Sequence, residues 1–187
     1  MKTIIPFFIC IISFASAPLF AAKPNVLFII SDDLTSTALG CYGNKDLRTP
    51  HLDRLAADGA IFTNAFTVTP VCSPSRAAYM SGRWPTQVGI TDWISPSEAR
   101  EELIGLHESI WPQVLQRAGY RTAMIGKWHL GALSQFHPTR KGFDLFYGFL
   151  DGGTQPMNPL LEVAGKEQIV EGDEPNIHAN AAIEFIR

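Results

Sequence analysis

Residues 25–33 read NVLFIISDD, and this stretch decides the predicted fold. Its first six residues form a continuous apolar run rich in branched side chains, which is typical of a strand buried on both faces of a parallel sheet. The run stops at Ser31, and Asp32 and Asp33 follow. Adjacent carboxylates are costly to desolvate without a cation or hydrogen-bond donors, and their oxygens suit calcium or magnesium better than zinc. The alternative is a helix cap that faces water.

Helical and strand-like patterns alternate after this stretch. In chain order we expect a helix over 49–59, a strand over 60–66, a helix from Pro74, a helix over 109–118 and a strand over 120–129. This order predicts an α/β fold with a mixed, largely parallel sheet flanked by helices. Residues 131–175 are rich in glycine, proline and polar residues and are expected to form mainly loops, whereas residues 180–187 begin an apolar helix.

The composition is that of a water-soluble globular protein. The chain has 187 residues, of which 46% are hydrophobic and 11% aromatic, and its formal net charge is -3. These values exclude the disordered and fibrous classes, and the charge gives no reason to expect a nucleic-acid partner.

The first 22 residues have the pattern of a secretory signal peptide. Lys2 precedes an apolar run, and small residues lead up to Ala22, so we expect cleavage near Ala21 or Ala22 and export to the periplasm or the extracellular space. A membrane anchor is the alternative, but the run is shorter than the roughly 20 residues of a spanning helix. No stable membrane anchor is expected, and Cys10 should leave with the signal peptide.

Two cysteines, Cys41 and Cys72, remain after the signal peptide. In an exported protein these two thiols could pair as a disulfide. However, Cys72 stands at the start of a predicted helix, where free amides and the helix dipole favour anions, and Arg76 follows one turn later. Such a thiol would be unusually reactive, although a lone cysteine in this position is more often a small buried side chain.

Lys127 and His129 stand at the exit of the strand predicted over residues 120–129. Because they are two residues apart, they should share one face of the strand. Sites in α/β proteins usually lie at the carboxyl ends of strands and at the helix starts that follow. Taken alone, a lysine and a histidine at a strand end are usually just solvated side chains.

A set of motifs in fixed order resembles the sulfatase family, from about residue 24 to the end of the chain. The motifs are Asp32-Asp33 after the first apolar run, Thr49-Pro50-His51-Leu52-Asp53, Cys72-Ser73-Pro74-Ser75-Arg76 within VCSPSRAAYMSG (residues 71–82), GKWHLG (126–131), and Gly142-Phe143-Asp144 leading to Tyr147-Gly148-Phe149. The resemblance implies a formylglycine-dependent sulfatase of arylsulfatase type, in the alkaline phosphatase superfamily. Ordered motifs are far more specific than any one of them alone.

This resemblance also implies a role for each site residue. A formylglycine-generating or equivalent maturation enzyme would convert Cys72 to formylglycine, whose hydrated aldehyde attacks the sulfur of a sulfate ester. Asp32, Asp33 and the modified Cys72 would coordinate Ca²⁺, and Arg76 would orient the nucleophile. Lys127 would bind the sulfate, and His129 would act as the base that lets sulfate depart after the alcohol.

The resemblance further implies a longer catalytic domain. The family's later Asp-Asn pair, histidine and lysine are not found before Arg187, so residues 23–187 are expected to be the N-terminal part of that domain, unstable and inactive alone. The substrate is expected to be an aryl or carbohydrate sulfate ester. The alternatives are a phosphate or phosphonate ester hydrolase of the same superfamily and a non-catalytic remnant that binds sulfated glycans.

Overall fold

The computed structural model describes residues 23–187 and divides the chain into two compact units, Met1–Leu34 and Thr35–Arg187. The signal peptide predicted over residues 1–22 lies outside the described residues. Within residues 23–187, no helix is both long enough and apolar enough to cross a membrane.

The described part of the first unit, residues 23–34, does not contain the predicted strand. Residues 25–30 have no secondary structure, and every residue from 23 to 33 is exposed. This corrects the expectation drawn from NVLFIISDD. A strand requires a hydrogen-bonded neighbour, and an apolar run of this kind requires cover on both faces; within residues 23–187 the run belongs to no β-ladder.

The second unit contains one four-stranded mixed sheet, which confirms the predicted α/β fold class. Its strands are β1 (Ala123–Lys127), β2 (Leu145–Phe149), β3 (Leu160–Val163) and β4 (Lys166–Ile169), in the order β1-β2-β3-β4. β1 and β2 are parallel, whereas β2–β3 and β3–β4 are antiparallel. Parallel pairing in the described part of the chain is therefore limited to β1 and β2.

Three of these strands lie where loops were predicted, in residues 131–175. β3 and β4 form a hairpin whose two connecting residues, Ala164 and Gly165, both have positive φ, at 52° and 78°. Two-residue hairpin turns of this kind usually contain Asn-Gly or Asp-Gly. The sequence lacks that signal, and each strand has only four or five residues, so composition alone indicates a loop.

The helices follow the predicted order. They are α1 (Pro50–Asp58), α2 (Cys72–Ser81), α3 (Trp111–Arg117) and α4 (Glu174–Ile186), with short 3-10 turns at Ser36–Ala38, Gly40–Tyr42, Glu98–Arg100, Ser134–Phe136 and Pro138–Arg140. Gly59 is the C-cap of α1, as predicted, while α2 begins at Cys72, two residues before the predicted start. The strand predicted over 60–66 is absent, because these exposed residues pair with no described strand.

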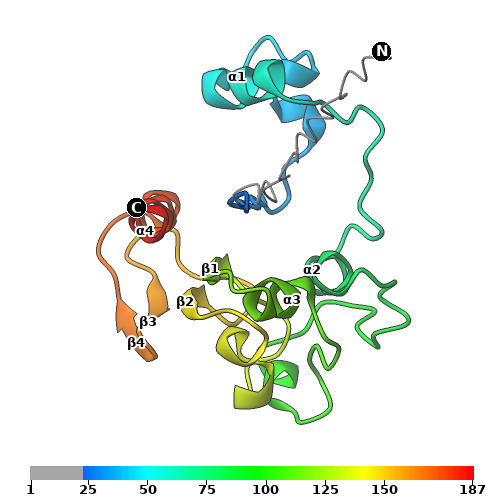
Figure 1. Ribbon diagram of the computed structural model, residues 1–187, viewed down its shortest axis with the longest axis vertical. Helices are drawn as coiled ribbons and strands as arrows, with labels where there is room; N and C mark the ends of the chain where they lie inside the picture. The colour runs from blue at the N-terminus through cyan, green and yellow to red at the C-terminus, as the bar shows by residue number, and fades with distance from the viewer. Residues whose placement is uncertain (1–22) are drawn as a thin grey trace, which may run out of the picture. The chain divides into compact units, whose positions relative to one another are not determined.

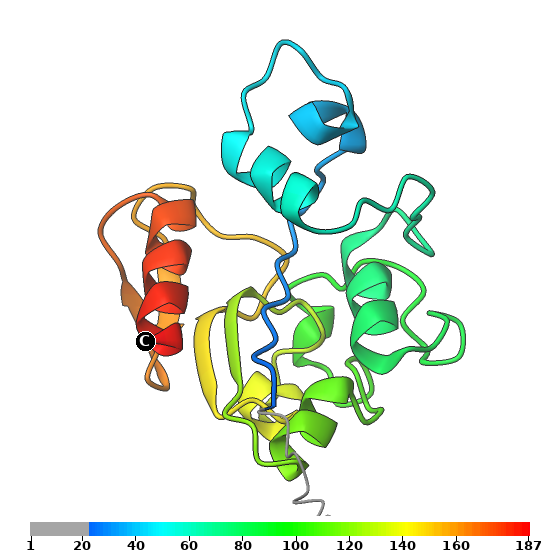
Figure 2. The same cartoon turned by 45° about the horizontal axis from the view of Figure 1, so that its top comes forward.

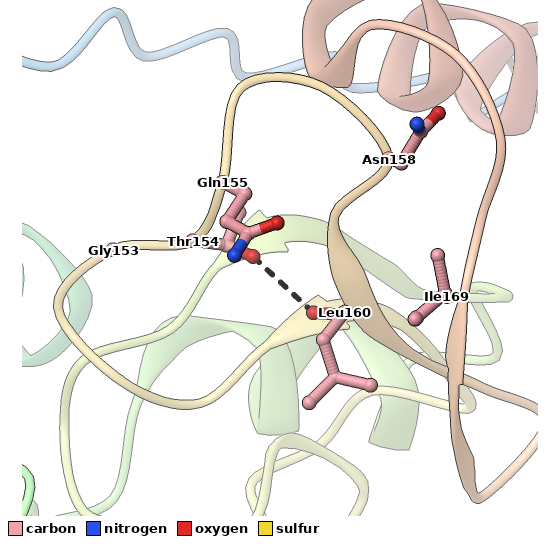
Figure 3. A pocket seen from close by; sticks show the side chains of 6 residues that line it. All are labelled: Gly153, Thr154, Gln155, Asn158, Leu160 and Ile169. Carbon is pink, nitrogen blue, oxygen red and sulfur yellow. Dashed lines mark hydrogen bonds between the residues drawn. The ribbon is translucent and has the colours of Figure 1, made fainter.

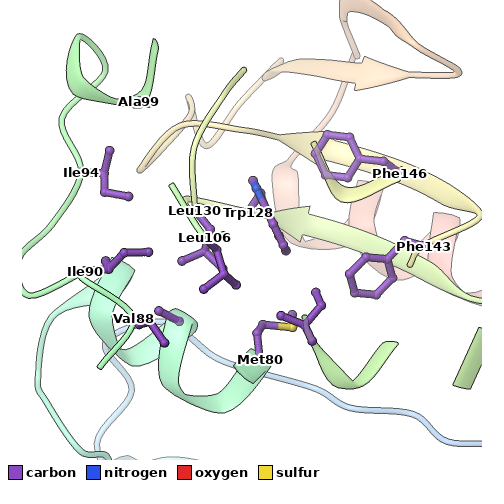
Figure 4. Packing of buried hydrophobic residues seen from close by; sticks show 12 residues of the cluster. Met80, Val88, Ile90, Ile94, Ala99, Leu106, Trp128, Leu130, Phe143 and Phe146 are labelled. Atoms are coloured by element: carbon purple, nitrogen blue, oxygen red, sulfur yellow. The ribbon is translucent and has the colours of Figure 1, made fainter. Parts of the chain in front are cut away.

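The hydrophobic core lies between the β1–β2 pair and the helices α2 and α3 (Figures 1 and 4). Trp128, Leu130, Phe146 and Met80 are each at most 4% exposed within it. α4 contacts the opposite face of β1 and β2 (Figure 2). This sandwich fixes the carboxyl end of β1 relative to the start of α2.

Candidate active site

Cys72 is the first residue of α2, so the predicted thiol at a helix start is confirmed. Pro74 lies in the first turn, where its missing N–H costs no hydrogen bond. Ser73, Pro74 and Ala77 are buried, and Cys72 is half-buried. The two described cysteines, Cys41 and Cys72, are not joined by a disulfide.

His129 lies just beyond β1 and is held by its neighbours on both sides. Trp128 and Leu130 are 1% and 0% exposed in the core, and His129 itself is 2% exposed. The backbone N–H of His129 donates to the carbonyl of Leu150 at 3.0 Å. Its φ of 61° is unusual for a residue with a side chain, and such strained residues cluster at functional sites.

Hydrogen bonds connect the start of α2 with the end of β1. The buried Arg76 guanidinium donates through Nη1 to the carbonyl of Lys127. A second connection passes through Ile94, whose N–H donates to Ser73 Oγ at 3.0 Å and whose carbonyl oxygen lies 2.8 Å from His129 Nε2. The structure therefore brings the Arg76 guanidinium to the Lys127 backbone and links Ser73, next to Cys72, to the His129 ring through Ile94.

The contact between His129 and Ile94 determines which ring nitrogen carries the proton. A backbone carbonyl only accepts hydrogen bonds, so Nε2 must be the donor in this contact. In the neutral ring, Nδ1 then carries the lone pair. Ile94 was missed by the sequence prediction because a backbone carbonyl has no side-chain signature.

Lys127 lies half-buried at the end of β1, close to the start of α4. Burial raises the pKa of the Glu174 carboxyl on α4, and the positive charge of Lys127 acts in the opposite direction. Lys127 therefore carries its positive charge close to the Glu174 carboxyl at the start of α4. A fixed cation in this position suits an anionic substrate group.

The predicted calcium ligands Asp32 and Asp33 are exposed and lie in the other unit. Their oxygens are of the type that calcium prefers. However, no group of three His, Cys, Asp or Glu side chains that would hold a metal ion occurs within residues 23–187. The described residues thus offer a suitable pair of donors but do not form a complete calcium site.

The other histidine and the tryptophans around the site differ in burial. His137 Nε2 lies 3.0 Å from Glu162 Oε2, and both side chains are less than a fifth exposed. Trp128 packs in the core, whereas Trp84 and Trp93 are 61% and 52% exposed. The Trp93 ring centroid is 6.4 Å from that of His129.

A hollow of about 540 Å³ lies beyond the loop that follows β2 (Figure 3). It is lined by Gly153, Thr154, Gln155, Asn158, Leu160 and Ile169. Thr154 Oγ1 donates to the Leu160 carbonyl at 3.3 Å, which closes one side. None of the predicted site residues lines this hollow, so it is separate from the candidate active site.

Comparison with known proteins confirms the resemblance drawn from the motifs. A family model described as Sulfatase matches residues 24–177. Steryl-sulfatase of Homo sapiens is 38% identical over 157 residues, which cover 79% of this chain and 27% of the human protein.

Two solved structures are also similar. Ps i-CgsB in complex with k-i-k-neocarrahexaose has 32% identity and a TM-score of 0.81 over 88% of this chain and 41% of that one. BT4656 in complex with its substrate D-glucosamine-2-N,6-O-disulfate has 34% identity and a TM-score of 0.75, over 88% of this chain and 31% of that one. This chain spans less than half the length of each of these three relatives, but the matched region contains all of the motifs described above, and the chain belongs to the sulfatase family.

Proposed function

We propose that the protein hydrolyses sulfate esters and that this chain supplies its nucleophile, its base and one sulfate-binding cation. The observation that carries the proposal is the hydrogen-bonded connection from α2 to the end of β1. Through it, Arg76 contacts Lys127 and Ser73 is linked through Ile94 to His129. Family membership then gives this constellation its chemistry.

Cys72 is the proposed position of the nucleophile. Conversion of its thiol to formylglycine by a maturation enzyme would supply a hydrated aldehyde at the start of α2. A developing negative charge there is favoured by the free amides of the first helical turn. The buried Arg76 guanidinium lies one turn further along the same helix and holds Lys127 by its carbonyl.

His129 is the proposed general base, acting through Nδ1. Its Nε2–H bond to Ile94 leaves Nδ1 to accept a proton from the hydroxyl that remains after the alcohol has left. Removal of that proton lets the aldehyde C=O bond re-form, while the bond between the same carbon and the sulfate oxygen breaks and sulfate departs with both of its electrons. Lys127 balances the charge of the bound sulfate.

Calcium binding by Asp32, Asp33 and the modified Cys72 is part of the proposal. The ion would polarise the sulfate oxygens when bound. Support comes from the donor chemistry of the aspartate pair and from its place in the ordered family motifs. None of the steps assigned to His129 or Lys127 depends on the ion.

A carbohydrate sulfate is the proposed substrate class. BT4656 was solved in complex with a sulfated glucosamine as its substrate, while the human relative is named for steryl sulfates. The exposed Trp93 ring, whose centroid lies 6.4 Å from that of the buried His129 ring, offers a flat surface of the kind that suits a sugar. Export to the periplasm or the extracellular space fits a substrate of this kind.

The direct test compares matched aryl sulfate and aryl phosphate esters as substrates of the protein from its native host. We expect faster turnover of the sulfate ester, with its loss in a Cys72→Ala variant and no loss in Cys41→Ala. Preference for the phosphate ester would instead favour a phosphohydrolase. Binding of sulfated glycans without turnover would favour a non-catalytic role.

A further inference from the structure

Two loops enclose the His129 side chain. The loop after β2 contributes the Leu150 carbonyl, which accepts the His129 N–H, and Gly152, which lies against the imidazole. A Cβ atom on Gly152 would lie 2.7 Å from Cε1 and 2.8 Å from Nε2 of His129. Only a residue without a side chain therefore allows this loop to approach the ring so closely.

The other loop contributes the Ile94 carbonyl, the partner of His129 Nε2. It continues to the 3-10 turn Glu98–Arg100, where the Ala99 carbonyl accepts the N–H of Ala132 at 2.7 Å. This second backbone contact lies three residues beyond His129. The loop is thus held at the His129 side chain and again at the backbone three residues later.

A bidentate ion pair joins the two loops. Arg100 Nη1 and Nη2 donate to Asp151 Oδ1 and Oδ2 at 2.9 and 3.1 Å. Nη1 also donates to the carbonyl of Pro96, within the same loop as Ile94. Paired guanidinium–carboxylate bonds fix the relative orientation of the two groups as well as their separation.

We propose that Arg100 and Asp151 are positioning residues for His129, an inference that rests on the proposed function. Asp151 lies between the two residues that touch His129, Leu150 and Gly152. Arg100 holds that segment against the loop that carries the Ile94 carbonyl. The ion pair thereby keeps Nε2 on Ile94 and fixes the direction in which Nδ1 points.

An ion pair on the surface that has no positioning role would leave catalysis unchanged when it is removed. The Arg100 and Asp151 side chains are 54% and 32% exposed, so the pair should add little to stability. Its effect should appear instead in catalysis, because small displacements of a catalytic group slow the chemical step without weakening substrate binding.

The first test compares Asp151→Asn and Arg100→Gln with the native protein on an aryl sulfate. Each should lower kcat roughly 10- to 100-fold, with KM and the melting temperature nearly unchanged. The double variant should lose no more than either single variant, because the pair acts as a unit. The matched control is Asp58→Asn, which breaks the exposed pair of Arg54 and Asp58 on α1 and should leave kcat unchanged. A kcat loss below about twofold in both single variants would overturn the proposal.

The second test uses two adjacent glycines. Gly152→Ala should lower kcat by displacing the ring, whereas Gly153→Ala should not, because a Cβ atom on Gly153 meets nothing within 4 Å. Equal losses in both variants would indicate a general effect on the loop and would count against the positioning of His129 by the Arg100–Asp151 ion pair.

A third measurement separates this inference from the proposed function. In protein with nitrogen-labelled histidine, the ring signals of His129, identified by their loss in His129→Gln, should report hydrogen on Nε2. Asp151→Asn should shift them toward mixed tautomers, even if the protein does not cleave sulfate esters. A native-like His129 signal in Asp151→Asn would overturn the positioning role of the ion pair, whatever the activity of the protein. A shifted signal in a protein that does not cleave sulfate esters would overturn only the proposed function.

Discussion

The surroundings of His129 and the segment that carries Asp32 and Asp33 differ in how the chain holds them. His129 is 2% exposed and contacts Ile94, Leu150 and Gly152, whereas both aspartates are exposed in a turn. The chain therefore encodes the geometry of the proposed nucleophile and base through its own packing. Asp32 and Asp33 supply carboxylate oxygens that suit calcium, but both side chains are exposed.

The largest loss of activity is expected on substitution of the buried His129. His129→Gln keeps a hydrogen bond to the Ile94 carbonyl within reach but removes the basic Nδ1 atom. We expect kcat on a sulfate ester to fall roughly 100- to 10,000-fold, as for the loss of a general base. Burst kinetics should reveal release of alcohol in the first turnover and a block before sulfate release. A variant with full steady-state turnover would contradict the assignment.

A smaller loss is expected when the connection between α2 and β1 is weakened. Arg76→Lys retains the charge but loses the planar fork that reaches the Lys127 carbonyl. We expect kcat to fall roughly 10- to 100-fold. Arg83→Lys, an exposed position just after α2, is the matched control. Equal behaviour of the two variants would show that the connection has no catalytic role.

A change at Asp33 should alter the calcium dependence of activity and leave the stability of the protein unchanged. Asp33→Asn removes one carboxylate, so the calcium concentration for half-maximal activity should rise by at least about tenfold. The melting temperature without calcium should not change, because Asp33 is exposed. Asp46→Asn, at another exposed aspartate, is the control. An unchanged calcium requirement would remove Asp33 from the proposed ligand set.

The smallest effect is expected on the far face of the sheet. Burial lowers the pKa of His178, which lies against the rings of Tyr147 and Phe149 and 3.6 Å from Glu174. The unfolded chain therefore binds a proton first as the pH falls through 6.5, and stability declines from there to the lower folded pKa. Melting temperatures of His178→Gln should fall less over this range than those of the native protein. Parallel curves would contradict this expectation.

The elements that carry Cys72 and Lys127 were easier to predict from the sequence than the rest of the sheet. The helix start at Cys72 and the strand exit at Lys127 follow from Pro74 and from an apolar run, which are strong local signals. The prediction of a strand over residues 25–30 was wrong because an apolar run indicates burial but does not show which strand would pair with it. The hairpin at Ala164-Gly165 was missed because alanine rarely adopts the positive φ that the turn needs.

The residues that orient His129 were also beyond the reach of the sequence. Ile94 acts through its carbonyl, and Gly152 acts through the absence of a side chain. Arg100 and Asp151 are 51 residues apart, and nothing in their local patterns indicates that they pair. Such contacts arise only when two loops are folded against the same strand end.

The measurement that most directly tests the central claim is the mass of the peptide spanning residues 71–82, from protein made in the native host. We predict that Cys72 is found as formylglycine, with an aldehyde carbon in place of the thiol-bearing methylene. The peptide containing Cys41 should keep its thiol and serves as the internal control. An unmodified thiol at Cys72 in protein that still cleaves sulfate esters would contradict the assigned nucleophile.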